Sequence, residues 1–294
     1  MKTKNILYLF LLANLAIILP ICAGDKELKK QKRQAFFDSN SDIFQGLKVI
    51  YDLYRDDNYI TKKRPFGTIY FPTELREMII EAMRSDENGQ ALLDAIVNCN
   101  INQVNQLLKK RYINTNVQNM NGETSLILAI RGKLPKVVKK LLQKKTNLDL
   151  QDKDGWTALN WAARNSNTNL AVIQKTTKIV EMLLQNGANP NLQDDIGKTA
   201  LHNAIRCNII KIVQMLLLAK DTNLDLQDNS GDTALHMATY YNCPEMVKIL
   251  LEKGAHPNLR DIEGKTPLQW ATKRNYTEIV QMLNDALENK SLNL

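Results

Sequence analysis

The stretch "DDIGKTALHNAI", residues 194–205, contains the Gly-Lys-Thr tripeptide that ends many phosphate-binding loops. Such a loop also needs a glycine five residues before the glycine of the tripeptide, because backbone N–H groups must curl around the phosphate. Leu192 stands at that position, and Leu259 stands there before the second copy of the tripeptide at residues 264–266. The sequence therefore argues against a phosphate-binding loop, and the recurrence indicates a repeat.

Six related stretches follow the pattern D-x-x-G-x-T-x-L, starting at residues 86, 119, 152, 194, 228 and 261. Their glycines, Gly89, Gly122, Gly155, Gly197, Gly231 and Gly264, are separated by 33, 33, 42, 34 and 33 residues. A period near 33 is typical of a solenoid built from stacked units. The longer interval places an insertion of about nine residues near 166–174, between the two helices of the third unit.

Each unit can be interpreted physically, with the fourth as the example. Asp194 and Gly197 suit a turn, because Asp bonds to its own backbone and Gly accepts a positive φ. Thr199 stands where a hydroxyl can cap a helix, and Leu201 and Ala204 lie on one face of that helix. Apolar residues at helical spacing over residues 208–218 predict a second helix. In this interpretation the Lys198 tripeptide is a turn followed by a helix cap.

These motifs resemble the ankyrin repeat. The family pattern G-x-T-P-L-H-x-A stands at residues 197–204 and 231–238, and V-x-x-L-L-x-x-G-A-x-x-N stands at 180–191 and 247–258. The resemblance implies an all-α solenoid of stacked helix pairs with β-turn fingers. It places five repeats over residues 119–294 and a degenerate or capping repeat over residues 86–118, where Ala91 replaces the threonine. It also implies a protein that binds other proteins without catalysis.

The sequence offers no constellation for chemistry. Of the three histidines, His202 and His236 share one repeat position, which the resemblance assigns to bracing the turn, and His256 lies in a loop. The alternative for the first two is a metal pair or a catalytic base. Cys99, Cys207 and Cys243 have no metal-ligand or disulfide spacing. We therefore expect no enzymatic activity, no cofactor, no metal and no small-molecule substrate.

Residues 1–23 read as a secretory signal peptide, with lysines before an apolar stretch and small residues at its end. We expect cleavage and export, to the periplasm or outside the cell, as for a bacterial protein that acts on host proteins. An uncleaved membrane anchor is the alternative, which the basic run at residues 29–33 favours. Cys22 ends a stretch similar to a bacterial lipidation box, although Ile21 departs from its pattern.

Residues 24–85 separate this signal from the repeats. They begin with a solvated basic arm and then show helix-like patterns at residues 41–54 and 71–85. The second of these, opening at Pro72, resembles the first helix of an F-box, which would make the chain an adaptor for a ubiquitin ligase. We interpret the helix instead as a cap on the open end of the first repeat.

The resemblance also implies a binding surface at the ends of the first helices and at the turn tips. The helix-end positions are Arg131, Arg164, Arg206, Tyr240, Tyr241, Lys273 and Arg274, and the turn-tip positions are Trp156, Lys198 and Lys265. Arginine, tyrosine and tryptophan dominate binding hot spots. We therefore predict a continuous basic strip that binds an acidic protein partner. The alternatives are scattered surface charge and nucleic-acid binding, since the net charge is +8.

Overall fold

The computed structural model describes residues 73–110, 113–144, 146–164 and 169–291. The predicted signal peptide, Cys22, the basic arm and the predicted helix at 41–54 lie outside these residues. The chain divides into two compact units, Met1–Glu87 and Asn88–Leu294. Only residues 73–87 of the first unit are described, whereas most of the second unit is.

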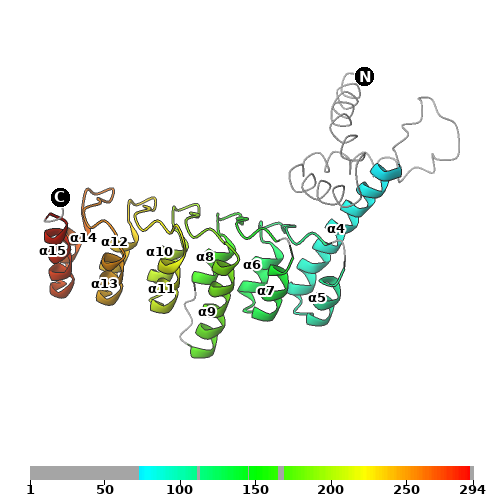
Figure 1. Ribbon diagram of the computed structural model, residues 1–294, viewed down its shortest axis with the longest axis horizontal. Coiled ribbons are helices and arrows are strands. Elements are labelled where there is room, and N and C mark those ends of the chain that lie inside the picture. Colours follow the sequence, from blue (N-terminus) through cyan, green and yellow to red (C-terminus); the bar gives the residue numbers. More distant parts are fainter. Residues whose placement is uncertain (1–72, 111–112, 145, 165–168, 292–294) are drawn as a thin grey trace, which may run out of the picture. The chain divides into compact units, whose positions relative to one another are not determined.

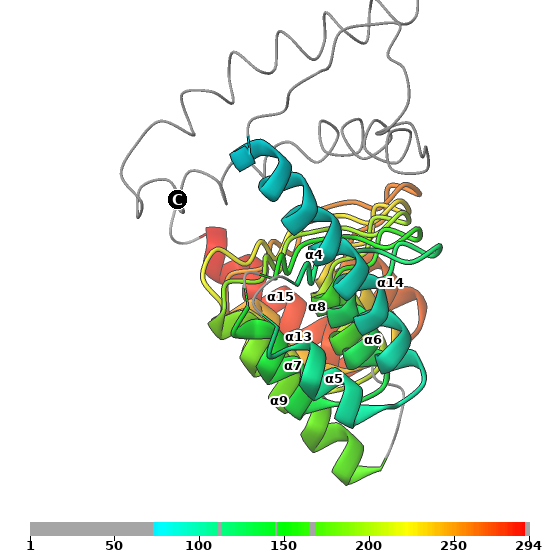
Figure 2. The same cartoon turned by 90° about the vertical axis from the view of Figure 1, so that its right-hand side faces the viewer.

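The second unit is a stack of helix pairs (Figure 1). After α4 (Thr73–Val97) and α5 (Ile101–Leu107), the five pairs are α6 (Ser125–Arg131) with α7 (Pro135–Leu142), α8 (Ala158–Ala163) with α9 (Leu170–Gln185), α10 (Ala200–Arg206) with α11 (Ile210–Leu218), α12 (Ala234–Tyr240) with α13 (Pro244–Glu252), and α14 (Pro267–Lys273) with α15 (Thr277–Ser291). The first helices of the pairs form one layer and the second helices another, with the turns projecting beyond them (Figure 2). Among the described residues the only β pairing is one bridge, Gln118 to Thr124. The predicted all-α class is confirmed.

Each first helix begins at a threonine that caps it. In all five pairs the threonine hydroxyl accepts the backbone N–H three residues further on; these threonines are Thr124, Thr157, Thr199, Thr233 and Thr266. The preceding glycine lies in the left-handed region, with φ of 76° at Gly197 and 74° at Gly264. Both Gly-Lys-Thr tripeptides are thus a turn followed by a helix cap, as the sequence predicts.

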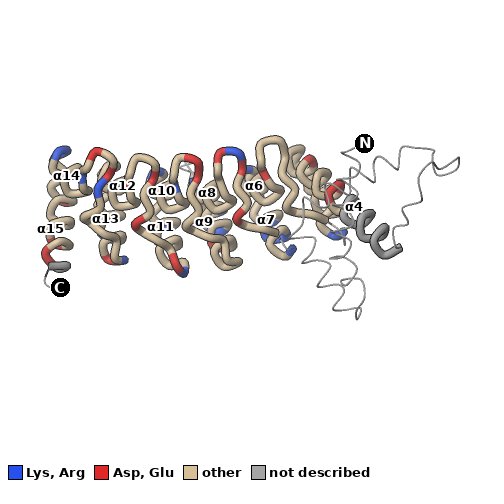
Figure 3. The backbone as a smooth tube through the Cα atoms, turned by 90° about the horizontal axis from the view of Figure 1, so that it is seen from above, with Lys and Arg blue, Asp and Glu red and all other residues tan. Residues whose placement is uncertain are grey.

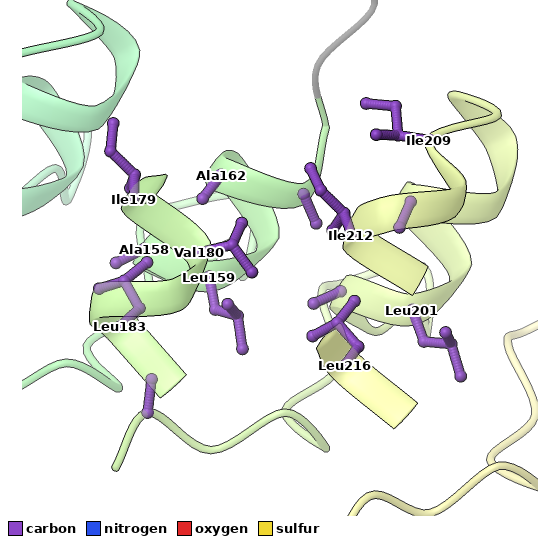
Figure 4. Packing of buried hydrophobic residues seen from close by; sticks show 14 of the residues in the cluster. Ala158, Leu159, Ala162, Ile179, Val180, Leu183, Leu201, Ile209, Ile212 and Leu216 are labelled. Atoms are coloured by element: carbon purple, nitrogen blue, oxygen red, sulfur yellow. The ribbon is translucent and has the colours of Figure 1, made fainter. Parts of the chain in front are cut away.

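The core runs through the stack between the two helix layers. Small residues of the first helices are completely buried, which lets the second helices approach closely: Ala204 and Ala238 are each 0% exposed. Leu201 of α10 is 2% exposed and packs in the same cluster as Ile212 and Leu216 of α11. Figure 4 shows these side chains between α10 and α11, and the corresponding set between α8 and α9. Burial of this kind is the main stabilising contribution in a repeat array.

A row of glutamines joins successive repeats. The side-chain amide of each donates to the glycine carbonyl of its own turn and to a carbonyl before the next turn, at 2.6–2.9 Å: Gln118 to Gly122 and Gln151, Gln151 to Gly155 and Gln193, Gln193 to Gly197 and Gln227, and Gln227 to Gly231 and Arg260. At the last turn Arg260 donates to Gly264 alone. This glutamine ladder satisfies carbonyls that helices cannot reach.

The first predicted turn does not form. α4 runs without a break from Thr73 to Val97, through Gly89, so the predicted helix at 71–85 and the first helix of the degenerate repeat are one helix. Ala91 lacks the hydroxyl that caps the other first helices, and Gly89 does not adopt a positive φ. Glycine is required there for another reason, because a side-chain carbon would collide with the Asn114 carbonyl and the Val117 side chain. The predicted domain boundary at residues 85–86 therefore lies inside a helix.

The insertion in the third repeat lengthens its second helix. α9 has 16 residues, whereas α11 has 9. The additional first turn of α9 leaves Leu170 68% exposed beside an open groove between α9 and α11. The predicted insertion is thus in part a helix extension, and residues 165–168 lie outside the described residues.

Candidate functional site

The predicted helix-end residues all lie where the sequence places them, at the ends of the first helices. Arg131, Arg206, Tyr240 and Lys273 are the last residues of α6, α10, α12 and α14, and Arg164, Tyr241 and Arg274 cap the ends of α8, α12 and α14. We call these seven residues the helix-end strip. Tyr240 and Tyr241 are 48% and 42% exposed, which is unusual for large aromatic side chains.

At one end of the strip, two arginines and two tryptophans form a ladder. The Arg131 guanidinium lies 4.7 Å from the Trp161 ring centroid, and that of Arg164 lies 4.8 Å from the Trp156 ring centroid. The two tryptophan rings are 5.0 Å apart. These distances suit cation–π attraction. Trp156, placed by the sequence at a turn tip, is only 8% exposed, so it contributes to the surface by holding Arg164. We call these four residues the arginine–tryptophan ladder.

Near the other end of the strip, Trp270 gathers three cations. The Lys265, Lys273 and Arg274 charges lie 4.4, 5.2 and 5.7 Å from its ring centroid. Arg274 also lies 4.1 Å from the Tyr240 ring centroid, and the Tyr240 and Trp270 rings meet edge to face at 6.3 Å. Aromatic faces therefore fix the direction of these cationic side chains.

Trp161 and Trp270 are the residues of this surface that sequence reasoning missed. Both occupy the variable position before the alanine of the repeat pattern. The indole N–H of each donates to a buried aspartate nine residues earlier: Trp161 to Asp152 at 2.7 Å, and Trp270 to Asp261 at 2.6 Å. The turn aspartate followed nine residues later by tryptophan is a signal that the sequence contains. Leu128, Asn203 and Met237 occupy this position in the other repeats.

The middle of the strip is cationic but carries no tryptophan. Arg206 is half-buried, and the neighbouring Cys207 lies close enough to both Arg206 and Arg164 to sense their charge. Burial raises the pKa of the Cys207 thiol, and the two arginines act in the opposite direction.

The turn tips are mixed in charge, as Figure 3 shows along the array. Arg131 pairs with Glu123, Lys265 pairs with Glu263, and Lys198 lies 3.7 Å from the Asp228 carboxylate. Burial raises the pKa of Asp232 to about 6, and the nearby carboxylates of Asp228 and Asp261 add to the shift. The predicted cations at the turn tips, Lys198 and Lys265, therefore lie beside carboxylates.

The histidines brace turns, as the resemblance implies. The Thr199 backbone N–H donates to His202 Nδ1 at 3.2 Å, so the proton is on Nε2, which lies 3.1 Å from the Asp232 carbonyl of the next repeat. Burial lowers the pKa of His202 to about 4. His236 makes the same pair of contacts, to Thr233 and to the Lys265 carbonyl. His256 contacts Asp225 of the preceding repeat.

The described residues also bear on metal binding and on membrane insertion. Across residues 73–110, 113–144, 146–164 and 169–291, no three histidine, cysteine, aspartate or glutamate side chains group as metal ligands would. Within the same part of the chain, no helix has the length and apolar character needed to cross a membrane.

Comparison with known proteins agrees with this architecture. A family model described as ankyrin repeats (3 copies) matches residues 92–173, 168–261 and 226–293. Similar solved structures include EF0377, an ankyrin repeat protein, with 26% identity, a TM-score of 0.59 and coverage of 67% of this chain and 97% of that one. No curated protein matches the chain.

Two further structures are similar over the same part of the chain. The ankyrin repeat domain of Bcl-3, a member of the IkappaB protein family, has 26% identity and a TM-score of 0.58, covering 67% of this chain and 85% of that one. An ankyrin repeat domain from Acinetobacter baumannii AYE has 28% identity and a TM-score of 0.58, covering 66% and 96%. The family model spans more than half of the sequence, so the chain belongs to the ankyrin-repeat family.

Proposed function

We propose that the chain binds an acidic protein segment along the helix-end strip. Ankyrin repeats indicate a protein–protein interaction module, and the strip gives that module a chemical preference. The observation that carries the proposal is the pair of cation–aromatic groups, one at each end of the strip, around Trp161 and around Trp270. Arginine, tyrosine and tryptophan combine apolar area with directed donors, which is why they dominate binding energies.

The charge pattern supports an acidic partner. Lys273, Arg274, Arg164 and Arg206 have no carboxylate within ion-pair distance in the described part of the chain. A partner carboxylate can therefore pair with them without displacing an internal ion pair. The turn tips carry carboxylates such as those of Asp195 and Asp232, which would repel an acidic segment and so favour the helix ends over the turns.

The experiment begins with the purified chain as bait in bacterial and eukaryotic lysates, followed by reconstitution with the purified partner. Arg206→Glu, and separately the double change Tyr240→Ala with Tyr241→Ala, should each weaken binding at least about tenfold, or about 1.4 kcal/mol, with little change in melting temperature. The control is Lys211→Glu, which makes the same charge reversal on the second helix α11.

Two outcomes would contradict the proposal. The first is a partner whose affinity is unchanged by the helix-end substitutions but lost on substituting residues of the second helices or of residues 24–85. The second is recovery of nucleic acid instead of protein, with an affinity that falls steeply as salt is added. Recruitment of a ubiquitin ligase through the helix after Pro72 would correspond to the first outcome.

A further inference from the structure

A small pocket lies between the second and third repeats, at one end of the helix-end strip. Its volume is about 160 Å³. Ile130, Ala162 and Ile179 make its apolar floor, and all three are buried. Its charged lining residues are Arg131, Lys133 and Arg164, and none of the described residues that line it carries a carboxylate. The pocket therefore combines an apolar floor with a cationic rim.

The two arginines of the rim are held before any ligand arrives. Each guanidinium rests on a tryptophan of the arginine–tryptophan ladder, and the ring of Trp161 is fixed in turn by its hydrogen bond to buried Asp152. Side chains fixed in this way lose little conformational freedom on binding, so more of the contact energy appears as affinity.

The charge at the rim is only partly compensated. Arg131 pairs with Glu123, whereas Lys133 and Arg164 have no carboxylate within ion-pair distance among the described residues. The C-terminal ends of α6 and α8 contribute about half a negative charge each. The site remains cationic after both are counted, which is the condition that favours an anion.

We infer that this pocket binds the carboxylate of one aspartate or glutamate of the protein partner, an inference that rests on the proposed function. A pocket of about 160 Å³ is large enough to admit a side chain the size of glutamate. The methylene groups of such a side chain would contact the apolar floor. Its two carboxylate oxygens would receive hydrogen bonds from Arg164 and Lys133, where a planar guanidinium can bind both oxygens at once.

Lys133 allows a test that leaves the fold intact. Its backbone is left-handed, with φ of 54°, and the corresponding positions of the last three repeats are Asn208, Asn242 and Asn275, with φ of 54°, 53° and 58°. Asparagine tolerates this conformation better than most residues. Lys133→Asn thus removes the charge while installing the residue that the fold uses elsewhere. Lys211→Gln removes one charge from α11 and is the matched control.

The probe is a phage-displayed library of random peptides, selected on the full-length chain. Enriched peptides should share one Asp or Glu at a fixed position. In a synthetic peptide, replacing that residue by its amide should weaken binding to the unaltered chain and to Lys211→Gln at least about tenfold. The same replacement should weaken binding to Lys133→Asn less, because the contact with Lys133 is then already absent and only the contact with Arg164 remains to be lost.

The outcomes separate this inference from the proposed function. If enriched peptides depend on Arg206, Tyr240 and Tyr241 but share no fixed acidic residue, the pocket assignment is wrong and protein binding along the strip stands. The pocket assignment is equally wrong if the amide replacement costs the same in all three proteins. If no peptide is enriched, or if peptides bind independently of the strip, the proposed function is wrong and the inference falls with it.

Discussion

The indole N–H of Trp161 donates a 2.7 Å hydrogen bond to the buried carboxylate of Asp152, and this bond connects a turn to the helix-end strip. The other oxygen of Asp152 accepts the backbone N–H groups of Asp154 and Trp156. All three of these groups are N–H donors, so one residue shapes the turn and orients an aromatic ring that carries Arg131.

Asp152→Asn should destabilise the fold. The new amide must direct its NH₂ group at a donor, which leaves a buried polar group without a partner and costs about 1–3 kcal/mol. Denaturant unfolding measures the loss, and tryptophan fluorescence should report a changed environment of Trp161.

Asp194→Asn is the control for this substitution. In the fourth repeat Asn203 replaces the tryptophan, and one buried oxygen of Asp194 has no hydrogen-bond partner. Burial also raises the pKa of Asp194, so a neutral amide is favoured there. Its free energy of unfolding should stay within about 0.5 kcal/mol of the unaltered chain, or rise. Equal losses for both substitutions would show that the bond to Trp161 contributes nothing.

His202 should make the stability depend on pH. Its pKa is about 4 in the folded chain and 6.5 ordinarily, so between these values the unfolded chain binds more protons. The free energy of unfolding should therefore fall as pH drops from 6.5 to 4, by up to about 3 kcal/mol from this group. His202→Gln should remove this dependence while keeping the helix cap, because Gln269 has that role in the sixth repeat.

The comparison of the two proteins isolates His202 from other groups. Asp232, with its pKa raised to about 6, favours the folded state as pH falls and so acts in the opposite direction, but it is present in both proteins. His236, whose pKa is also lowered, is likewise common to both. Parallel pH profiles for the two proteins would show that burial of His202 is not linked to stability.

Leu201 and Lys198 should respond very differently to alanine, although only two residues separate them. Leu201 is 2% exposed in the core, so Leu201→Ala should cost about 2–5 kcal/mol. Lys198→Ala loses a single 3.7 Å ion pair, in which the lysine side chain is 21% exposed and that of Asp228 4%, so its cost should be smaller. Thermal melts distinguish the two. A Lys198 variant as damaging as Leu201→Ala would indicate that the tripeptide has a further role.

We propose that the chain is exported, and N-terminal sequencing of the native protein tests this. The apolar run before Pro20 and the small residues after it predict that the mature chain begins between Ala23 and Asp25. An intact Met1 in a membrane fraction would instead support an uncleaved anchor, and a lipid on Cys22 would support the lipidation alternative.

The parts of the fold that the sequence predicts are those fixed by local chemistry that recurs. A threonine equivalent to Thr199 caps a helix, and a glycine equivalent to Gly197 forms a turn, in each of the five well-formed repeats. The repetition itself therefore identifies the role of each residue. The helix-end strip follows from the same register. The predicted turn at Gly89 is wrong because the pattern shows only that glycine is present, whereas the structure shows that it is needed for close approach to Asn114.

The two tryptophans beside the helix-end strip could not be predicted from the repeat pattern. Trp161 and Trp270 stand at a position that has a different residue in each of the other repeats, so the repeat pattern assigns no residue type to it. Their importance comes from contacts to Arg131 and Lys265, which belong to another helix and to a turn. The sequence period identifies the residues that the repeats share, whereas these tryptophans are residues in which the repeats differ.

The glutamine ladder has a consequence for how such a protein can change its length. Each glutamine closes its own turn and reaches the next, so an internal repeat brings its own donor and finds a ready acceptor on either side. Duplication or loss of a whole repeat would leave no hydrogen bond of the ladder unmade. The array can therefore gain or lose entire units without disturbing the hydrogen bonds that join the units that remain.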